Sequence, residues 1–87
     1  MNITVHKLHD MRIGNEPHTL LDIRETHELE VCSIDGSIDI PMDTLPENMD
    51  KLPKEEPLVV MCHIGGRSAQ VVNWLIQNGY NNALNLE

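Results

Sequence analysis

The part of this sequence best suited to chemistry is a cysteine followed by two glycines, an arginine and a serine. Cys62 comes directly after the apolar run 58–61 and precedes a segment, 68–78, with helical spacing of apolar residues. At such a strand-to-helix turn, backbone N–H groups and the positive end of a helix dipole converge. We predict that this environment favours the thiolate and that Cys62 is a catalytic nucleophile. The predicted active loop comprises Cys62, His63, Ile64, Gly65, Gly66, Arg67 and Ser68.

The alternative for Cys62 is a buried thiol that merely ends a strand, because free cysteine is among the most buried residue types. That interpretation does not account for the two adjacent glycines, which let the backbone turn tightly. It also does not explain why an arginine, Arg67, stands at the start of the next helix. The catalytic interpretation explains more of the segment.

Size and charge restrict the possible partners. The 87 residues are expected to form one domain, 1–87, with a small core. A formal charge of −8 argues against nucleic acid or an anionic membrane surface as partner, since both attract clustered Lys and Arg. From 57 to 87 the only formally charged side chains are Arg67 and Glu87. An anionic reactant could therefore approach Cys62 without crossing a dense acidic patch.

The cysteines and histidines predict a reducing compartment and argue against a zinc site. Two cysteines, with no apparent signal peptide or long apolar run, are typical of a reducing compartment, so the expected location is the cytoplasm. Cys32 is interpreted as a small buried residue, with a resolving thiol as the alternative. The histidines other than His63 are scattered. They do not form a ligand set with the cysteines, so neither a metal nor another cofactor is expected.

Short apolar runs alternate with helical ones along the chain, which predicts βα units and a mostly parallel sheet. The expected strands are 3–5, 20–23, 38–40, 58–61 and 83–86. Run 58–61 should lie at the sheet centre and 38–40, stopped by Pro41, at an edge. Helices are expected up to Gly14, from Thr26, from Asp43 or Thr44, and over 68–78 with Gly79 just beyond. The last helix should bury Val71, Val72, Leu75 and Ile76, with Trp74 partly packed.

In this order and spacing, the segments resemble single-domain rhodaneses, sulfurtransferases that pass a sulfane sulfur through a cysteine persulfide. Segments 20–25 and 34–41 are similar to the family's two signature stretches, and 62–68 fits its C-x-x-G-x-R-S active loop. Segment 79–86 resembles the approach to its last strand. The resemblance implies an α/β fold with a mostly parallel five-stranded sheet and helices on both faces. It also implies an abbreviated version that ends at Glu87 before the family's final helix.

The resemblance further implies a ping-pong reaction. The Cys62 thiolate would take the outer sulfur of thiosulfate or a persulfide and pass it to cyanide, glutathione or a protein dithiol. Backbone N–H groups from His63 to Ser68 would stabilise the terminal sulfur. An imidazole is largely neutral at about pH 7, so His63 should attract the thiosulfate anion only weakly. We therefore predict that persulfide donors are preferred, or that thiosulfate is used better at lower pH. A loop histidine without a role is the alternative.

Two arginines are expected near the loop. Arg67 either adds positive potential or braces the loop by pairing with Asp22 or Glu25, and bracing is favoured because its planar fork suits a carboxylate. Arg24 is interpreted as a structural brace as well.

Two other functions compete with sulfur transfer. The cell-cycle dual-specificity phosphatases resemble rhodaneses in fold, but their loop is one residue longer than the four residues, 63–66, between Cys62 and Arg67 here. Met61 also replaces the histidine that usually precedes their cysteine. A non-catalytic rhodanese-like module that binds a partner or reports redox state is the stronger rival. Because Cys62 and both glycines are present, the sequence favours the enzyme.

Overall fold

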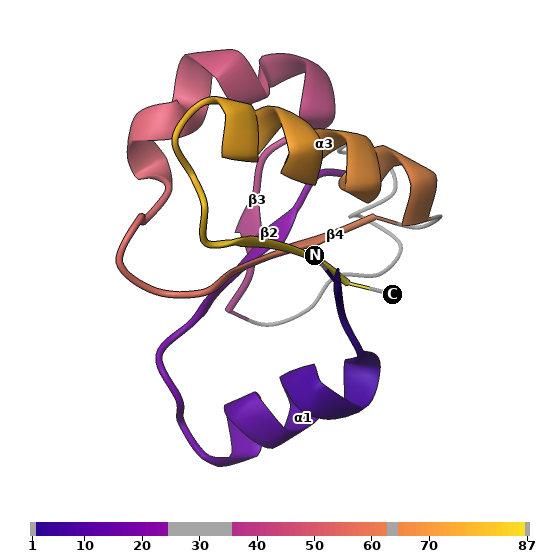
Figure 1. The fold of residues 1–87 in the computed structure, drawn as a ribbon, viewed down its shortest axis with the longest axis vertical. Helices are drawn as coiled ribbons and strands as arrows, with labels where there is room; N and C mark the ends of the chain where they lie inside the picture. The colour runs from indigo at the N-terminus through magenta and orange to yellow at the C-terminus, as the bar shows by residue number, and fades with distance from the viewer. Residues whose placement is uncertain (1, 25–35, 63–64, 87) are drawn as a thin grey trace.

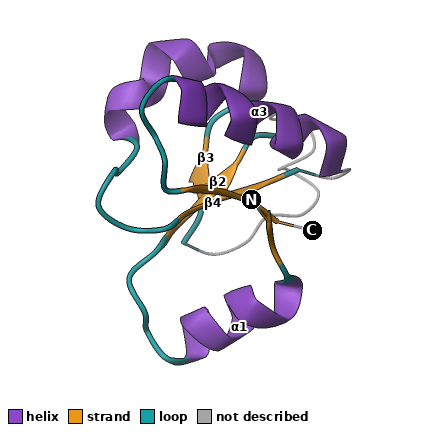
Figure 2. Ribbon diagram, in the orientation of Figure 1, coloured by secondary structure: helices purple, strands orange, loops and turns teal. Residues whose placement is uncertain are grey.

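The computed structural model describes residues 2–24, 36–62 and 65–86. Its middle layer is a five-stranded sheet in the order β1-β5-β4-β2-β3, and each neighbouring pair runs parallel. The strands are β1 (Asn2–Ile3), β2 (Thr19–Asp22), β3 (Ile38–Asp39), β4 (Leu58–Met61) and β5 (Ala83–Leu86). Helix α1 (Val5–Ile13) lies on one side of the sheet, while η1 (Met42–Lys51) and α3 (Gly65–Gln77) lie on the other (Figures 1 and 2). The predicted α/β fold, parallel sheet and helices on both faces are confirmed.

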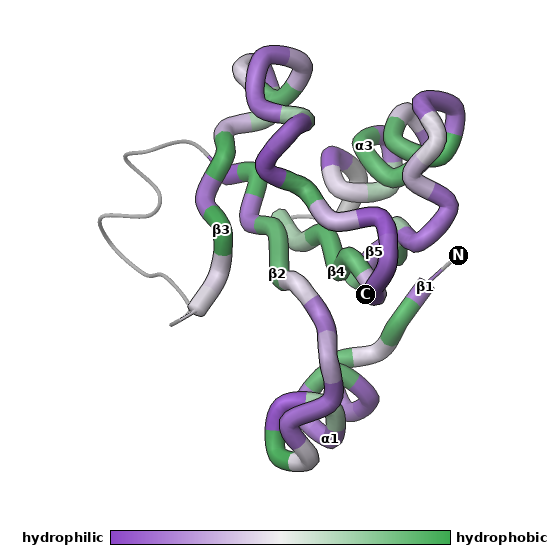
Figure 3. Tube along the Cα trace, turned by 90° about the vertical axis from the view of Figure 1, so that its left-hand side faces the viewer, coloured by the Kyte–Doolittle hydropathy of each residue, from purple (hydrophilic) through white to green (hydrophobic). Residues whose placement is uncertain are grey.

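Strand β4 occupies the centre of the sheet, as its continuous apolar run predicts. Leu58, Val59 and Val60 are fully buried, because strands pair on both edges of β4 and helices cover both faces. Figure 3 shows β4 as a hydrophobic stretch in the interior. Strand β3 lies at the sheet edge, also as predicted. The centre of the carboxyl edge of the sheet is therefore the point where β4 ends and Cys62 follows.

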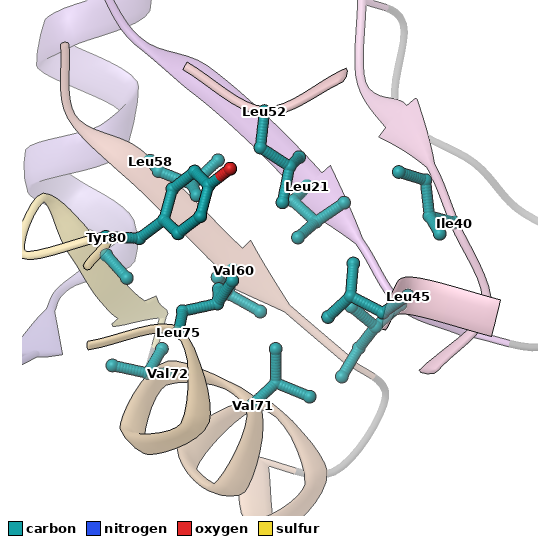
Figure 4. Close-up of a cluster of buried hydrophobic side chains, with 12 residues drawn as sticks. Leu21, Ile40, Leu45, Leu52, Leu58, Val60, Val71, Val72, Leu75 and Tyr80 are labelled. Carbon is teal, nitrogen blue, oxygen red and sulfur yellow. The ribbon is translucent and has the colours of Figure 1, made fainter. Parts of the chain in front are cut away.

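The core divides between the two faces of the sheet because successive strand residues point to opposite sides. Leu20 and Val59 face α1 and pack with Leu8 and Met11. The neighbouring Leu21 and Val60 face the other way, into a larger cluster that η1 and α3 close (Figure 4). From α3 this cluster takes the predicted side chains: Val71, Val72 and Leu75 are buried in it, and Trp74 and Ile76 pack against it half-buried.

The first strand is shorter than predicted. Strand β1 ends at Ile3, and helix α1 already begins at Val5. Thr4 caps this helix, since its hydroxyl oxygen accepts a hydrogen bond from the Lys7 N–H at 3.1 Å. The cap outweighs the β preference of Val5, whose side chain is 59% exposed and has little to gain from a sheet.

Helix η1 also differs from the prediction of an ordinary α-helix. It is a 3-10 helix that begins at Met42, with Pro46 inside it and non-helical backbone angles at Asn48. Proline has no N–H to donate and crowds the preceding turn, so the α-helical ladder cannot continue through it. Leu45 nevertheless reaches the core, where it is 1% exposed.

Helix α3 ends as the sequence predicts. Gly79 has a φ of +94°, its N–H donates to the Ile76 carbonyl at 3.2 Å, and the Tyr80 N–H donates to the Leu75 carbonyl at 2.9 Å. These two bonds form a Schellman motif, which needs a left-handed residue just past the helix and therefore favours glycine. The helix expected from Thr26, together with Cys32, lies outside the described residues.

Candidate functional site

Cys62 lies one residue beyond β4, half-buried at the carboxyl edge of the sheet. Its sulfur accepts a hydrogen bond from the backbone N–H of Ser68 at 3.3 Å. Ser68 belongs to the start of α3, so the positive end of the helix faces the sulfur. The side chain also packs against the larger core cluster. The site thus places an N–H donor and the positive end of a helix dipole at the sulfur, the two features that hold negative charge in such a position.

Gly65 and Gly66 lie inside helix α3 and not in the loop before it, where the sequence places them. Helix α3 begins at Gly65, three residues before the predicted start at Ser68, so Gly65 and Gly66 form its first turn. The prediction that they make a tight turn ahead of the helix is wrong. Glycine has a low helix propensity, which is why a sequence reading starts the helix later. The first residues of a helix have backbone N–H groups without an intrahelical partner.

Ser68 is held by a second contact, to a residue that the sequence analysis missed. Its hydroxyl donates a hydrogen bond to the side-chain oxygen of Asn85 on β5. Both residues are buried, and Asn85 pairs with Val60 of β4 in the sheet. One signal was available in the sequence: Asn85 is the single polar residue of strand 83–86 and occupies the same face as Ala83.

Asp22 and Arg24 form a buried ion pair where β2 ends. The Arg24 Nε lies 3.0 Å from each carboxylate oxygen of Asp22, and its Nη2 lies 2.7 Å from Oδ2. The Arg24 backbone N–H also donates to Oδ1 at 3.1 Å. In the sheet register Asp22 pairs with Met61, the residue before Cys62. The ion pair thus joins two residues at the end of β2, beside the strand that leads to Cys62, and the bracing role of Arg24 stays a prediction.

The remaining predicted site residues are placed only in part. Arg67 is half-buried in the first turns of α3. The Asp22 carboxylate, one of its two expected partners, is bound by Arg24. The other, Glu25, lies outside the described residues, as do His63 and Ile64. Both proposed roles of Arg67 therefore stay predictions.

Within 2–24, 36–62 and 65–86, no three His, Cys, Asp or Glu side chains are grouped as a metal site would require. No helix in the same ranges has the length and apolar character needed to cross a membrane.

Comparison with known proteins identifies the family. The model of the Rhodanese-like domain matches residues 4–87. This chain belongs to the rhodanese-like domain family. Its structure is similar to that of a rhodanese-like domain protein from Staphylococcus aureus, with a TM-score of 0.92 and 35% identity over 100% of this chain and 85% of that one. The predicted resemblance to the rhodanese family is thereby confirmed for the family and the fold.

Relatives include proteins named for sulfur transfer. A sulfurtransferase of Allochromatium vinosum is 37% identical over 67 residues, which cover 77% of this chain and 63% of that protein. A thiosulfate sulfurtransferase, GlpE, of Tolumonas auensis is 32% identical over 68 residues, or 78% of this chain and 64% of the relative. A rhodanese-like/PpiC domain-containing chloroplast protein of Arabidopsis thaliana is 33% identical over 98% of this chain and 31% of its own length. This chain therefore spans less than two thirds of each of these relatives.

Proposed function

We propose that this chain is a sulfurtransferase that carries a sulfane sulfur as a persulfide on Cys62. The observation that carries the proposal is the hydrogen bond from the Ser68 N–H to the Cys62 sulfur, at the positive end of α3. A donor aimed at this atom stabilises the Cys62 thiolate both when it attacks the donor and when it leaves as the persulfide is consumed. Membership of a family whose relatives are named sulfurtransferases supports the same chemistry.

The first half-reaction loads the cysteine. The Cys62 thiolate attacks the outer sulfur of thiosulfate or of a persulfide, and a new S–S bond forms. The bond from that outer sulfur to the rest of the donor breaks, and sulfite or a thiolate leaves with the electron pair. Cys62 then holds one additional sulfur atom, and no external oxidant or reductant is consumed.

The second half-reaction returns the free thiolate. An acceptor nucleophile attacks the outer sulfur of the persulfide, and Cys62 leaves with the electron pair of the S–S bond. Cyanide would yield thiocyanate, while glutathione or one thiol of a protein dithiol would itself become a persulfide. Because the donor product leaves before the acceptor reacts, the kinetics should be ping-pong.

The proposed partners follow from this chemistry. They are a small sulfur donor and a thiol acceptor, with no nucleic acid and no membrane surface. The part of the chain from 57 onward, with few charges, suits anionic donors such as thiosulfate. The cytoplasmic location stays a prediction from the cysteine content.

Thiocyanate formation from a sulfur donor and cyanide tests the proposal. We expect turnover by the parent chain with thiosulfate or glutathione persulfide, its loss in Cys62→Ser, and its retention in the matched variant Cys32→Ser. Turnover in Cys62→Ser would contradict the assignment of the nucleophile. No turnover in the folded parent with either donor would favour the non-catalytic module.

A further inference from the structure

An amide side chain lies buried in the last strand of the sheet, near the end that faces the candidate site. Asn85 is 9% exposed and pairs with Val60 of β4, two residues before Cys62. Its strand neighbour on the same face is the fully buried Ala83. Burying an amide at a position that an apolar side chain could fill is unfavourable unless its polar atoms are hydrogen-bonded. The contacts of Asn85 therefore indicate what the amide does there.

Those contacts lead to the cysteine through a single residue. The Asn85 side-chain oxygen accepts from the Ser68 hydroxyl, and the backbone N–H of the same serine donates to the Cys62 sulfur at 3.3 Å. The Ser68 side chain is fully buried. The hydroxyl and the N–H are separated only by Cα and Cβ, so fixing one limits how the other can turn. A central part of the sheet is thus connected to the direction of the N–H that faces sulfur.

The orientation of the Asn85 amide has its own support. Its nitrogen donates toward the side-chain oxygen of Asn2 on β1, at 3.5 Å. With the NH₂ group directed toward β1, the carbonyl oxygen is left to face Ser68. This orientation matters because only an acceptor atom at that position can accept the hydrogen bond from the Ser68 hydroxyl.

We propose that Asn85 is a positioning residue for the Cys62 thiolate and persulfide, acting through Ser68. Hydrogen bonds weaken steeply as the donor turns away from the acceptor. By holding the first turns of α3 in one rotation relative to β5, Asn85 keeps the Ser68 N–H aligned with sulfur. The inference rests on the proposed role of Cys62 and adds to it a residue outside the active loop.

A second amide, half-buried, provides the matched control. Asn82 precedes β5 and donates to the carbonyls of Pro53 and Glu56, at 2.9 and 2.7 Å. It ties down the connection before β4, at the end of the sheet away from Cys62. Removing it disturbs a comparable number of hydrogen bonds without touching the connection from Asn85 to Cys62.

The test measures the second-order rate of Cys62 alkylation by iodoacetamide at neutral pH, on a Cys32→Ser background so that one thiol reports. We expect Ser68→Ala and Asn85→Ala each to slow alkylation about fivefold, the effect of one misaligned hydrogen bond. The double variant should be no slower than the slower single variant, because both changes break one connection. Asn82→Ala should lower the melting temperature but leave the alkylation rate unchanged. In thiocyanate formation, kcat of each variant should fall by about the same factor as its alkylation rate, while KM for the donor stays constant.

Alkylation rates of Ser68→Ala and Asn85→Ala equal to that of Asn82→Ala would overturn the proposal, as would effects that multiply in the double variant. If Asn85→Ala does not fold, Ser68→Ala decides alone, since alanine fits the space of serine and retains the backbone N–H. Alkylation does not require sulfur transfer. A chain that never forms a persulfide would therefore refute the proposed function without altering the result of this test.

Discussion

The buried ion pair between Asp22 and Arg24 allows a quantitative prediction. Replacing Asp22 by Asn keeps the size of the side chain but removes its charge and one of its two acceptor oxygens. The Arg24 guanidinium, which now places three contacts of 2.7 to 3.0 Å on the carboxylate, would face an NH₂ group that cannot accept. The side chains of Arg24 and Asp22 are 8% and 0% exposed, so water cannot replace the lost acceptor.

The size of the effect follows from that burial. Removing one partner of a buried ion pair destabilises a protein by about 3 kcal/mol or more. A domain of this length loses about 4–8 °C of melting temperature per kcal/mol. Asp22→Asn should therefore melt roughly 12–24 °C below the parent chain.

Thermal unfolding followed by circular dichroism measures this difference. The exposed Asp50 provides the control, because Asp50→Asn removes the same charge from the surface and should shift stability by no more than about 0.5 kcal/mol. If Asp22→Asn melts within about 3 °C of the parent, the reasoning from burial and contact geometry is refuted. Equal shifts in the two variants would show that net charge, and not the ion pair, determines the change.

Three further changes test other parts of the structure. Gly79→Ala places a Cβ on a residue with a φ of +94°, so it should destabilise the fold by about 1–2 kcal/mol in urea unfolding. An unchanged urea midpoint would contradict the role of Gly79 in ending the helix. Leu75→Ala leaves a cavity at a fully buried position and should lower the free energy of unfolding in urea by about 2–5 kcal/mol. A loss below about 1 kcal/mol would show that α3 does not close the core. The donor ratio, which is kcat/KM for thiosulfate divided by kcat/KM for a persulfide donor, should rise as pH falls from about 8 to about 6, because the His63 imidazole gains charge there. A donor ratio that stays flat in the parent, or changes equally in His63→Gln, would leave His63 without a role.

The sequence predicts those parts of the fold that short-range patterns determine. Strand β5 (Ala83–Leu86) and strand β4 (Leu58–Met61) have the predicted bounds, because a buried parallel strand is a continuous or alternating apolar run between breakers. The helix end at Gly79 was equally predictable, since a left-handed residue is needed there.

Element starts were less predictable because single hydrogen bonds and glycines decide them. The Thr4 cap ends β1 early, and α3 begins at the low-propensity Gly65 because the tertiary structure overrides local preference. Contacts between distant residues were the least predictable. The Ser68–Asn85 hydrogen bond joins residues 17 positions apart, and neither side chain carries a pattern that names its partner.

The central claim is that Cys62 itself carries the transferred sulfur. Mass spectrometry of the intact chain after exposure to thiosulfate or glutathione persulfide tests it most directly, with peptide mapping to locate any modification. We expect the mass of one additional sulfur atom, located on Cys62, removed by cyanide and absent from Cys62→Ser. A parent chain that gains no sulfur from either donor, or a sulfur that maps to Cys32 and persists in Cys62→Ser, would contradict the claim.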